Sequence, residues 1–314
     1  MADILCLGEP LIEFNQQDDG LFLQGFGGDI SNVAISAARQ GAQAGILTQL
    51  GSDTFGDQFI ELWQSESVIT RHVARKQEGE TGLYFVTHDD DGHHFTYRRR
   101  SSAAREYNTG LLPIQALNDC QIFYASGISL AISQTSRDAV VTAAKCAREA
   151  GNSFAFDPNL RTALWPLEEA RHVTHEVMQH CDIALPGLDD ARQLTGLDDP
   201  HEILRFYHDM GARTVALTMG SSGVITSDAS GTHLCSPLRV DAVDATGAGD
   251  CFNGAFLAAL LRGMPPADAT HWANTAAALS TCGFGAVAPI PTLSQTENQL
   301  KEPGDPYDNW TYWR

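Results

Sequence analysis

The stretch that decides the fold is residues 240–258, VDAVDATGAGDCFNGAFLA. Small residues at Gly247, Ala248 and Gly249 stand directly before an apolar segment that predicts a helix. The free N–H groups at a helix start bind anions together with the helix dipole, and glycine lets a phosphate approach that backbone closely. The turn therefore predicts an anion site with the carboxylate of Asp250 beside it.

Asp250 stands where phosphoryl transfer would need a base. The helix dipole is expected to favour the ionised carboxylate and so make it a weak base. Phosphoryl transfer depends mainly on positioning and charge neutralisation, so a weak base is enough. Asp250 could take the proton of an attacking hydroxyl while the N–H groups of the turn neutralise the moving charge. From these residues alone, an ordinary N-terminal helix acid is an equal alternative.

On the N-terminal side of this turn, short apolar runs alternate with helical patterns. Strands are predicted over residues 4–7, 44–50, 121–125, 154–157, 183–185 and 214–218. Helices are predicted over residues that include 28–39, 55–63, 136–149 and 168–179. This alternation predicts an α/β fold, with a mainly parallel sheet covered by helices on both faces.

Two regions, 11–26 and 71–100, break the alternation with short β-like pieces and no helix between them. They suit a small sheet that projects from the core as a lid. We therefore expect a core of residues 1–10, 27–70 and 101–300, a lid of residues 11–26 and 71–100, and a tail of residues 301–314. The aromatic residues of the tail favour docking onto the body or a neighbouring subunit, and a loose end is the alternative.

The composition excludes several classes of partner. The 314 residues include 39 acids and 20 bases, which gives a net charge of −19. Nucleic acid and anionic membranes need a basic surface, so neither is expected as a partner. No apolar run approaches the roughly 18 residues of a membrane span, and the N-terminus lacks a basic signal region. Seven scattered cysteines suit reduced thiols, so we expect a cytoplasmic protein.

Residues 244–250, DATGAGD, resemble the C-terminal signature of the PfkB, or ribokinase-like, carbohydrate kinases. Ala245 is a mild departure from that signature. Residues 25–34, GFGGDISNVA, resemble the family's N-terminal sugar motif, and residues 218–223, TMGSSG, resemble its nucleotide turn. Residues 282–286, CGFGA, resemble the loop that closes over the adenine. The resemblance covers nearly the whole chain, from about residue 4 to residue 290.

The resemblance implies a ribokinase-like three-layer α/β/α core with a small β lid, and an ATP-dependent carbohydrate kinase. It implies that Asp250 is the general base and that Gly247, Ala248 and Gly249 form the anion hole. It implies that the sugar is bound by Gly28, Asp29 and Asn32. It implies that the nucleotide is bound by Thr218, Gly220, Gly223, Gly247, Gly249, Asn274 and Gly285. Lid sheets in this family often pair between subunits, so a homodimer through the lid is expected.

Three segments resemble the 2-keto-3-deoxygluconate kinases of this family: GEPLIE at 8–13, YRRRSSAA at 97–104 and DPNLR at 157–161. A sugar acid carries a carboxylate, which a guanidinium group binds with paired hydrogen bonds. Arg99 from the lid and Arg161 from the core would close on it. By resemblance, Tyr84 and Tyr97 line that pocket. A role for Arg161 in binding the nucleotide phosphates is the alternative, since the chemistry is the same.

The expected reaction is therefore the ATP-dependent conversion of 2-keto-3-deoxygluconate to its 6-phosphate. A fructokinase, ribokinase or nucleoside kinase is the alternative within the family, and a non-catalytic sugar sensor is the alternative of another class. Many members carry N-x-x-E where this chain has Gly187 and Asp190, so no protein ligand of Mg²⁺ is named. K⁺ stays open: Asp244 and Thr246 match the K⁺ positions of some members, with a structural role as an equal alternative.

Overall fold

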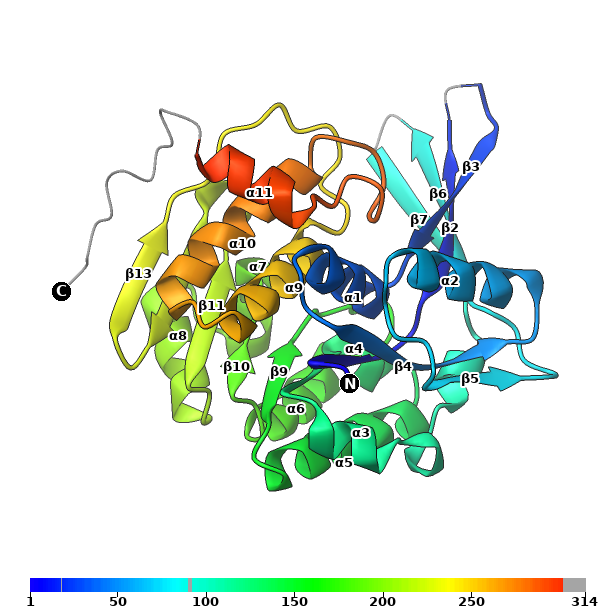
Figure 1. Cartoon of the computed structure of the whole chain (residues 1–314), viewed down its shortest axis with the longest axis horizontal. Coiled ribbons are helices and arrows are strands. Elements are labelled where there is room, and N and C mark those ends of the chain that lie inside the picture. The colour runs from blue at the N-terminus through cyan, green and yellow to red at the C-terminus, as the bar shows by residue number, and fades with distance from the viewer. Residues whose placement is uncertain (18, 90–91, 302–314) are drawn as a thin grey trace.

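The computed structural model describes residues 1–17, 19–89 and 92–301 (Figure 1). Its large sheet has the strand order β13-β12-β11-β10-β9-β8-β1-β4-β5. In chain order the strands are β1 (Ile4–Leu7), β4 (Ala44–Gly51), β5 (Val73–Lys76), β8 (Ile122–Ser126), β9 (Ser153–Asp157), β10 (Ile183–Ala184), β11 (Thr214–Thr218), β12 (Val224–Asp228) and β13 (Gly231–Cys235). Neighbours are parallel from β11 to β5, and only the β12 and β13 pairings are antiparallel. The predicted α/β fold is confirmed.

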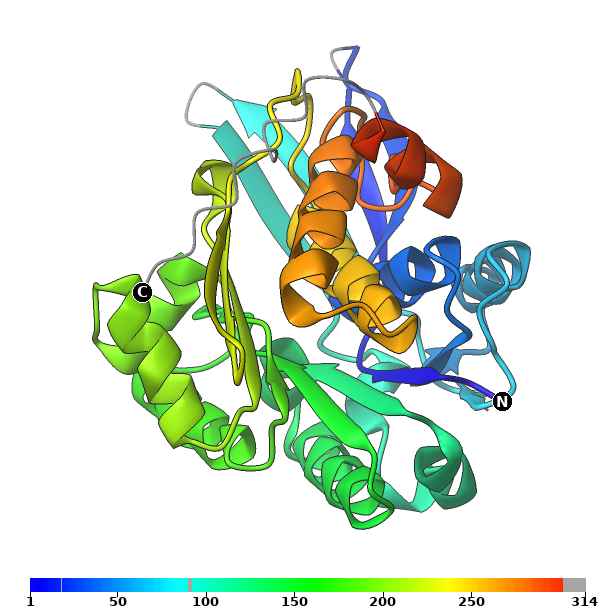
Figure 2. The same ribbon diagram turned by 60° about the vertical axis from the view of Figure 1, so that its left-hand side comes forward.

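Helices cover both faces of this sheet (Figures 1 and 2). One layer contains α1 (Asp29–Arg39), α2 (Thr54–Ser65), α9 (Ala248–Leu261), α10 (Pro266–Ser280) and α11 (Leu293–Leu300). The other contains α3 (Ile114–Asp119), α4 (Gly127–Ala131), α5 (Gln134–Glu149), α6 (Leu167–Met178), α7 (Leu188–Thr195) and α8 (Pro200–Asp209). The three layers predicted from the resemblance are therefore present.

Strand β1 divides the two hydrophobic cores. Ile4 and Cys6 lie in the core beneath α1 and α9, whereas Leu5 and Leu7 lie in the core beneath α5. This division follows from strand geometry, because successive side chains point to opposite faces of a sheet. A strand covered by helices on both faces has no polar face, which explains the unbroken apolar run ILCL.

A second sheet, with the order β3-β2-β6-β7, projects beside α2 (Figure 1). Its strands are β2 (Leu11–Gln16), β3 (Phe22–Gly27), β6 (Leu83–Asp89) and β7 (Gly92–Arg98). One face packs on α2, with Phe14 edge-on to Phe55 and Phe26 edge-on to Phe59. The contact anchors this sheet, which we call the lid, to the core.

Two parts of the expected division need comment. Strand β5 falls in the range 71–100 assigned to the lid, but it pairs with β4 in the large sheet, with Thr48 opposite Val73. It does so because the chain leaves α2 beside the open edge of β4. The aromatic tail, residues 302–314, lies outside the described residues. Within the described ranges, no helix is both long and apolar enough to cross a membrane.

Candidate functional site

The candidate site forms where the N-terminal ends of α1 and α9 meet. These helices pack closely because Gly254 faces α1: a Cβ at this position would lie 2.4 Å from the carbonyl oxygen of Val33. The close packing brings Asn32 of α1 to Asp250 of α9. The Nδ2 of Asn32 donates to the Oδ2 of Asp250 at 2.8 Å. Two residues that the motifs place 218 positions apart are thus direct partners.

Gly28 is the residue before α1 and can only be glycine. Its φ of 95° lies in the left-handed region. A Cβ there would lie 2.6 Å from the carbonyl oxygen of Glu9. No side chain caps this helix end, so the first N–H groups of α1 are available to a ligand.

Gly247 has the same function at the start of α9, with a φ of 75° and no side-chain cap. A Cβ on Gly247 would lie 2.9 Å from the Cβ of Ala286, so the turn is packed against residues 284–290. A Cβ built on Gly249 meets no atom within 4 Å, so this side of the turn is open. The end of α9 thus has the exposed N–H groups and the space that an anion site needs.

The carboxyl group of Asp250 is a stronger base than its place at a helix start suggests. Its burial and the negative charge of Asp29 raise the pKa of Asp250 to about 7. The hydrogen bond from Asn32 and the charge of Arg161 act in the opposite direction but are smaller. The helix dipole alone would keep this carboxylate a weak base, but desolvation together with the charge of a second carboxylate outweighs the dipole.

Asp29 and Asn32 present unpaired acceptors to the site. Asp29 is buried, and its Oδ2 accepts a hydrogen bond from the hydroxyl of Ser126. Its Oδ1 and the Oδ1 of Asn32 are buried and have no hydrogen-bond partner among the residues that the structure describes. Buried acceptors are costly unless something donates to them, so these two atoms suit the hydroxyl groups of a ligand. Ser126, at the end of β8, was not identified from the sequence.

Arg99 is already paired inside the protein. Its Nη2 donates to Glu9, whose other oxygen accepts from the hydroxyl of Ser102. The Nε of Arg99 is buried without a partner, and the guanidinium lies 5.6 Å from the ring centre of Tyr97. Glu9 was quoted in the sequence analysis but given no role there. Its position directly after β1, at the end of a buried strand, was the available signal.

Arg161 lies at the rim, with a side chain that is 49% exposed. Its Nη1 donates to the carbonyl of Leu160 at 2.8 Å and lies 3.9 Å from the Oδ2 of Asp190. The charges of Arg161 and Arg99 both lower the pKa of Asp29, although its burial raises that pKa more. The two arginines therefore act on one carboxylate from the core and from the lid.

The lid contributes two tyrosines and one acid. The hydroxyl of Tyr84 donates to Glu13, and the ring centres of Tyr84 and Tyr97 are 5.6 Å apart. Glu13 and Tyr84 are directly opposite across β2 and β6, and Tyr97 is opposite Tyr84 on β7. Glu13 was quoted in the sequence analysis but given no role. Side chains alternate along β2, which places Glu13 on the same face as the tyrosines, so the strand pattern could have predicted its position beside them.

Asp157 was also given no role, although it ends β9 and lies under the site. Its Oδ2 accepts from the Nδ2 of Asn253 at 2.8 Å, and its Oδ1 accepts from the N–H of Asn159 at 3.0 Å. Burial and the charges of Asp250 and Asp190 raise the pKa of Asp157 well above its ordinary value. This raised pKa favours the uncharged form of Asp157, which links the end of β9 to α9 through Asn253.

The residues expected on the nucleotide side form two groups. Thr218, Gly220 and Gly223 lie at the turn from β11 to β12, and a Cβ on Gly223 would meet the carbonyl of Cys235 at 2.2 Å. Asn274 reaches the same place, because its Nδ2 donates to the carbonyl of Ser236 at 2.9 Å. Gly285 lies apart from them, beside the turn of α9.

Asp244 joins Gly285 to that turn. Its Oδ2 accepts from the N–H of Gly285 at 2.9 Å, and its Oδ1 accepts from the N–H and hydroxyl of Thr246 at 2.9 and 2.6 Å. Both carboxylate oxygens are thus used within the chain, as a structural role requires. Over the described ranges, no three or more His, Cys, Asp or Glu side chains cluster as metal ligands.

A cavity of about 1350 Å³ lies between the lid and the core. Glu13, Val86 and Phe95 line it from the lid, and Asp244 and Ala286 line it from the core. The cavity therefore borders both the lid acid Glu13 and the turn that leads into α9.

Comparison with known proteins identifies the family of this chain. Residues 1–293 match the model of the pfkB family carbohydrate kinases. The chain is 30% identical to the 2-dehydro-3-deoxygluconokinase of Thermoproteus tenax, over 96% of this chain and 95% of that protein. It is 31% identical to the enzyme of the same name from Escherichia coli K12, over 91% and 97%, and 30% identical to probable fructokinase-4 of Arabidopsis thaliana, over 95% and 96%.

Solved structures agree in fold. A PfkB protein from Polaromonas sp. JS666 superposes with a TM-score of 0.86 at 28% identity, over 95% of this chain and 99% of that one. Aminoimidazole riboside kinase from Salmonella enterica gives a TM-score of 0.85 at 25% identity, again over 95% and 99%. With the family match spanning almost the whole chain, the conclusion is direct: this protein belongs to the pfkB family of carbohydrate kinases and is an ATP-dependent sugar kinase.

Proposed function

We propose that this kinase phosphorylates the 6-hydroxyl of 2-keto-3-deoxygluconate, the compound also called 2-dehydro-3-deoxygluconate. The observation that carries the proposal is the placement of Asp250. It is held by Asn32, stands at the glycine turn of α9, and neighbours Asp29, on which both Arg99 and Arg161 act. The relatives from Thermoproteus tenax and Escherichia coli, both named 2-dehydro-3-deoxygluconokinase, support this substrate.

Asp250 is the general base in this proposal. Burial and the charge of Asp29 raise its pKa to about 7, which is close to the value that best serves proton transfer at neutral pH. The unpaired oxygens of Asp29 and Asn32 would accept hydrogen bonds from the sugar and fix the attacking hydroxyl. The N–H groups at the start of α9 would neutralise the charge that develops on the transferred group.

ATP and Mg²⁺ complete the proposed reaction. The exposed N–H groups at Gly247 and the open side of Gly249 fit a phosphate chain, and Thr218, Gly223 and Asn274 mark the nucleoside side. Mg²⁺ prefers phosphate oxygens and water, and supplies charge neutralisation when bound. A ribokinase-like protein from Escherichia coli, 26% identical with a TM-score of 0.88, has been solved with ATP and Mg²⁺. The hydrogen bonds of Asp244 favour its structural role over a K⁺ site.

The carboxylate of the sugar acid is assigned to Arg99 and Arg161. The unpartnered Nε of Arg99 and the exposed guanidinium of Arg161 are donors of the kind that a carboxylate binds. The pairing of Arg99 with Glu9 favours a second candidate, a neutral ketose such as fructose, because Glu9 already offsets the charge of Arg99. The match to probable fructokinase-4 agrees with that candidate.

A coupled assay for ADP, run with a panel of sugar acids and neutral sugars, separates these possibilities. Asp250→Asn should lower kcat by about a thousandfold, because it removes the base. Asp189→Asn is the matched control, since that side chain is 93% exposed in the first turn of α7. Turnover by Asp250→Asn at the wild-type rate would refute the assignment of the base.

The arginines decide the substrate. Arg99→Ala should lower kcat/KM for the sugar acid by about a hundredfold and change that for fructose by less than about threefold, since only the acid loses a charged hydrogen bond. Arg100→Ala, an exposed neighbour, is the control. An equal loss on both substrates would favour the neutral ketose and a purely structural ion pair with Glu9.

We further propose that the enzyme works in the cytoplasm as a homodimer through its lid. Seven cysteines scattered singly along the sequence suit reduced thiols, which agrees with a reducing compartment. Leu23 and Phe95 are 59% and 51% exposed and lie on the lid face that carries Glu13 and Tyr84. A second copy would cover these apolar side chains and the open lid edge.

A further inference from the structure

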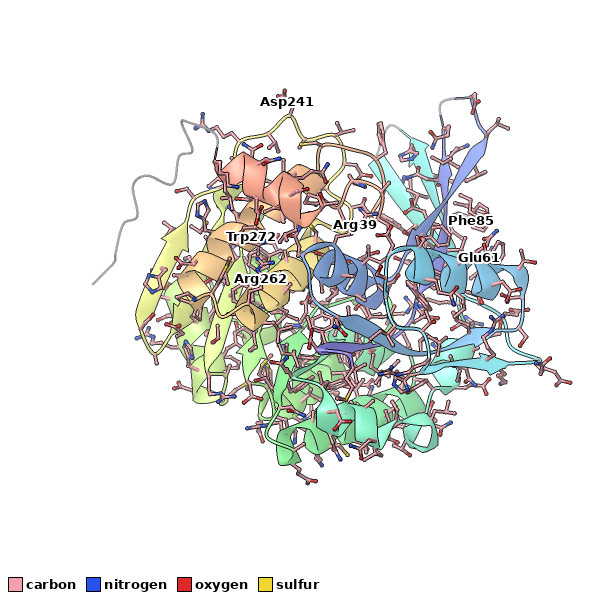
Figure 3. All side chains as sticks on the ribbon, in the orientation of Figure 1. Arg39, Glu61, Phe85, Asp241, Arg262 and Trp272 are labelled. Atoms are coloured by element: carbon pink, nitrogen blue, oxygen red, sulfur yellow. The ribbon has the colours of Figure 1, made fainter. Side chains whose placement is uncertain are left out.

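The C-terminal end of α1 carries an arginine with an unusual set of contacts. Arg39 is the last residue of α1, and its side chain is only 18% exposed (Figure 3). Its Nε and Nη2 donate to the two carboxylate oxygens of Glu66, each at 2.8 Å. Glu66 directly follows α2, so the paired hydrogen bonds fix the guanidinium in one orientation.

The remaining nitrogen of this guanidinium binds backbone. The Nη1 of Arg39 donates to the carbonyl of Ile290 at 2.5 Å and to that of Val287 at 3.0 Å, with the carbonyl of Ala288 at 3.4 Å. All three carbonyls belong to one connection, residues 281–292 between α10 and α11. The Nη1 of Arg39 thus donates to three carbonyl groups of a connection that has no regular secondary structure.

The connection that Arg39 binds also contacts the glycine turn before α9. Ala286 fills the space beside Gly247, where a Cβ would come within 2.9 Å. Gly285, the residue before it, donates its N–H to Asp244 at 2.9 Å. Arg39 therefore acts on the turn indirectly. It binds residues 287–290, and the adjoining residues 285–286 contact residues 244–247.

We propose that Arg39 is a positioning residue for phosphoryl transfer, which acts by holding residues 285–290 against Gly247 so that the first N–H groups of α9 stay aimed at the phosphate. The proposal rests on the anion role of that turn under the proposed function. A small displacement of the turn would cost rate, because transfer depends on alignment.

The chain offers a matched arginine that lacks this link. Arg262, directly after α9, donates its Nη1 to the carbonyl of Gln40 at 2.5 Å. Its guanidinium lies 4.4 Å from the ring centre of Trp272 (Figure 3). Arg262 binds the same end of α1 but makes no hydrogen bond to residues 284–290 among the described contacts. Loss of Arg262 should therefore weaken the fold without moving the turn.

The test compares Arg39→Ala, Arg39→Lys and Arg262→Ala in the full-length enzyme, with KM for ATP, KM for sugar, kcat and the thermal midpoint measured for each. We expect Arg39→Ala to lower kcat/KM for ATP about 10- to 100-fold, the value of one charged hydrogen-bond set, with KM for sugar within about twofold. Arg39→Lys should stay impaired, since an ammonium cannot bind Glu66 and the carbonyls in one plane. Arg262→Ala should lower the midpoint and leave kcat/KM unchanged.

Chemical rescue separates positioning from folding. Guanidinium at about 20 mM, far below denaturing concentrations, should raise the activity of Arg39→Ala about fivefold. It should not raise the activity of Arg39→Lys, because the lysine side chain fills the site. If Arg39→Ala is too unstable to purify, Glu66→Gln replaces it, with an expected smaller loss in kcat/KM for ATP.

Two outcomes overturn the proposal. One is wild-type kinetics in Arg39→Ala or its substitute. The other is a loss without rescue that falls equally on ATP and sugar, which means general misfolding. Failure of the proposed function has a different signature, because it would leave Asp250→Asn active whatever Arg39 does.

Discussion

Asp250 and Asp29 are two carboxylates of one site, and burial together with their mutual repulsion raises the pKa of Asp250. Asp29 is held by Ser126 and Asp250 by Asn32, so neither can turn away from the other. Each charge makes the second one harder to form. The site thus keeps a base whose pKa lies near neutrality without using a histidine.

The pH dependence of the reaction should carry this signature. Asp250 must be ionised to accept a proton, and its pKa is raised to about 7. We therefore expect kcat/KM to fall as the pH drops below about 7, whereas an ordinary carboxylate would hold activity down to about pH 5. Asp29→Asn removes the like charge and should move this limb to lower pH. Rate profiles between pH 5 and 9 test the shift, and an unmoved limb would show that Asp29 does not set the pKa.

The sequence was informative about single residues only where a motif carried them. Asp29, Asn32 and Asp250 come from glycine-rich motifs whose spacing is local, and the structure brings these three together. The pairing of Arg99 with Glu9 joins residues 90 positions apart, and no local pattern reports it. The raised pKa of Asp250 likewise depends on burial, which only the assembled fold determines.

At the scale of elements, the packing of α1 on α9 is the contact that builds the site. Both helices are short of large side chains where they cross, and Gly254 is the point of closest approach, with Val33 and Ser36 of α1 facing it. The crossing sets the distance between the sugar end and the phosphate end of the site. Stability and activity should therefore both respond to a single methyl group there.

Gly254→Ala should lower the free energy of unfolding by about 2 kcal/mol, because a Cβ would overlap the carbonyl of Val33 and force the helices apart. Gly249→Ala is the matched substitution in the same helix, with open space around its Cβ. It should keep full stability, since alanine favours a helix, while it obstructs the anion site. Urea unfolding and kcat measured together separate the two effects. Equal stability of both variants would contradict the close crossing.

Elements were predicted as far as alternation of strands and helices reaches. That pattern predicts the parallel strands β1, β4 and β8 to β11 and helices such as α1, α5 and α6, and these are confirmed. It misses the hairpin of β12 and β13, because an antiparallel pair needs no helix between its strands. It also misses the pairing of β5 with β4 in the large sheet. A strand can pair only with a free sheet edge beside it, and such an edge exists only in the folded chain.

For the whole molecule, the net charge of −19 and the site have little to do with each other. Two arginine charges act on Asp29, and two helix ends point their N–H groups into the site. Both are short-range features inside an acidic surface, since exposed charges are screened within about 10 Å in 0.1 M salt. The composition predicts which classes of partner to expect, and it could not describe the site.

Assembly is also a property at this scale. If the lid pairs between subunits, Phe95→Asp should convert a dimer into a monomer, because it places a charge in a buried apolar contact. Ile114→Asp is the control, since this side chain is 45% exposed on α3, outside the lid. Light scattering coupled to gel filtration gives the mass of each variant. A monomeric wild type, or a dimer that survives Phe95→Asp, would rule out this interface.

The place of β1 in the large sheet has a consequence for biosynthesis. The first strand of the large sheet in chain order, β1, lies in the interior of that sheet, between β4 and β8. Its partner β4 follows within about fifty residues, so β1, α1 and β4 can assemble while the rest of the chain is still being made. The later parallel strands β8 to β11 lie on the other side of β1, in chain order outward from it. Loss of the first seven residues would therefore remove the template for the whole sheet, whereas loss of α11 would remove only its last covering helix.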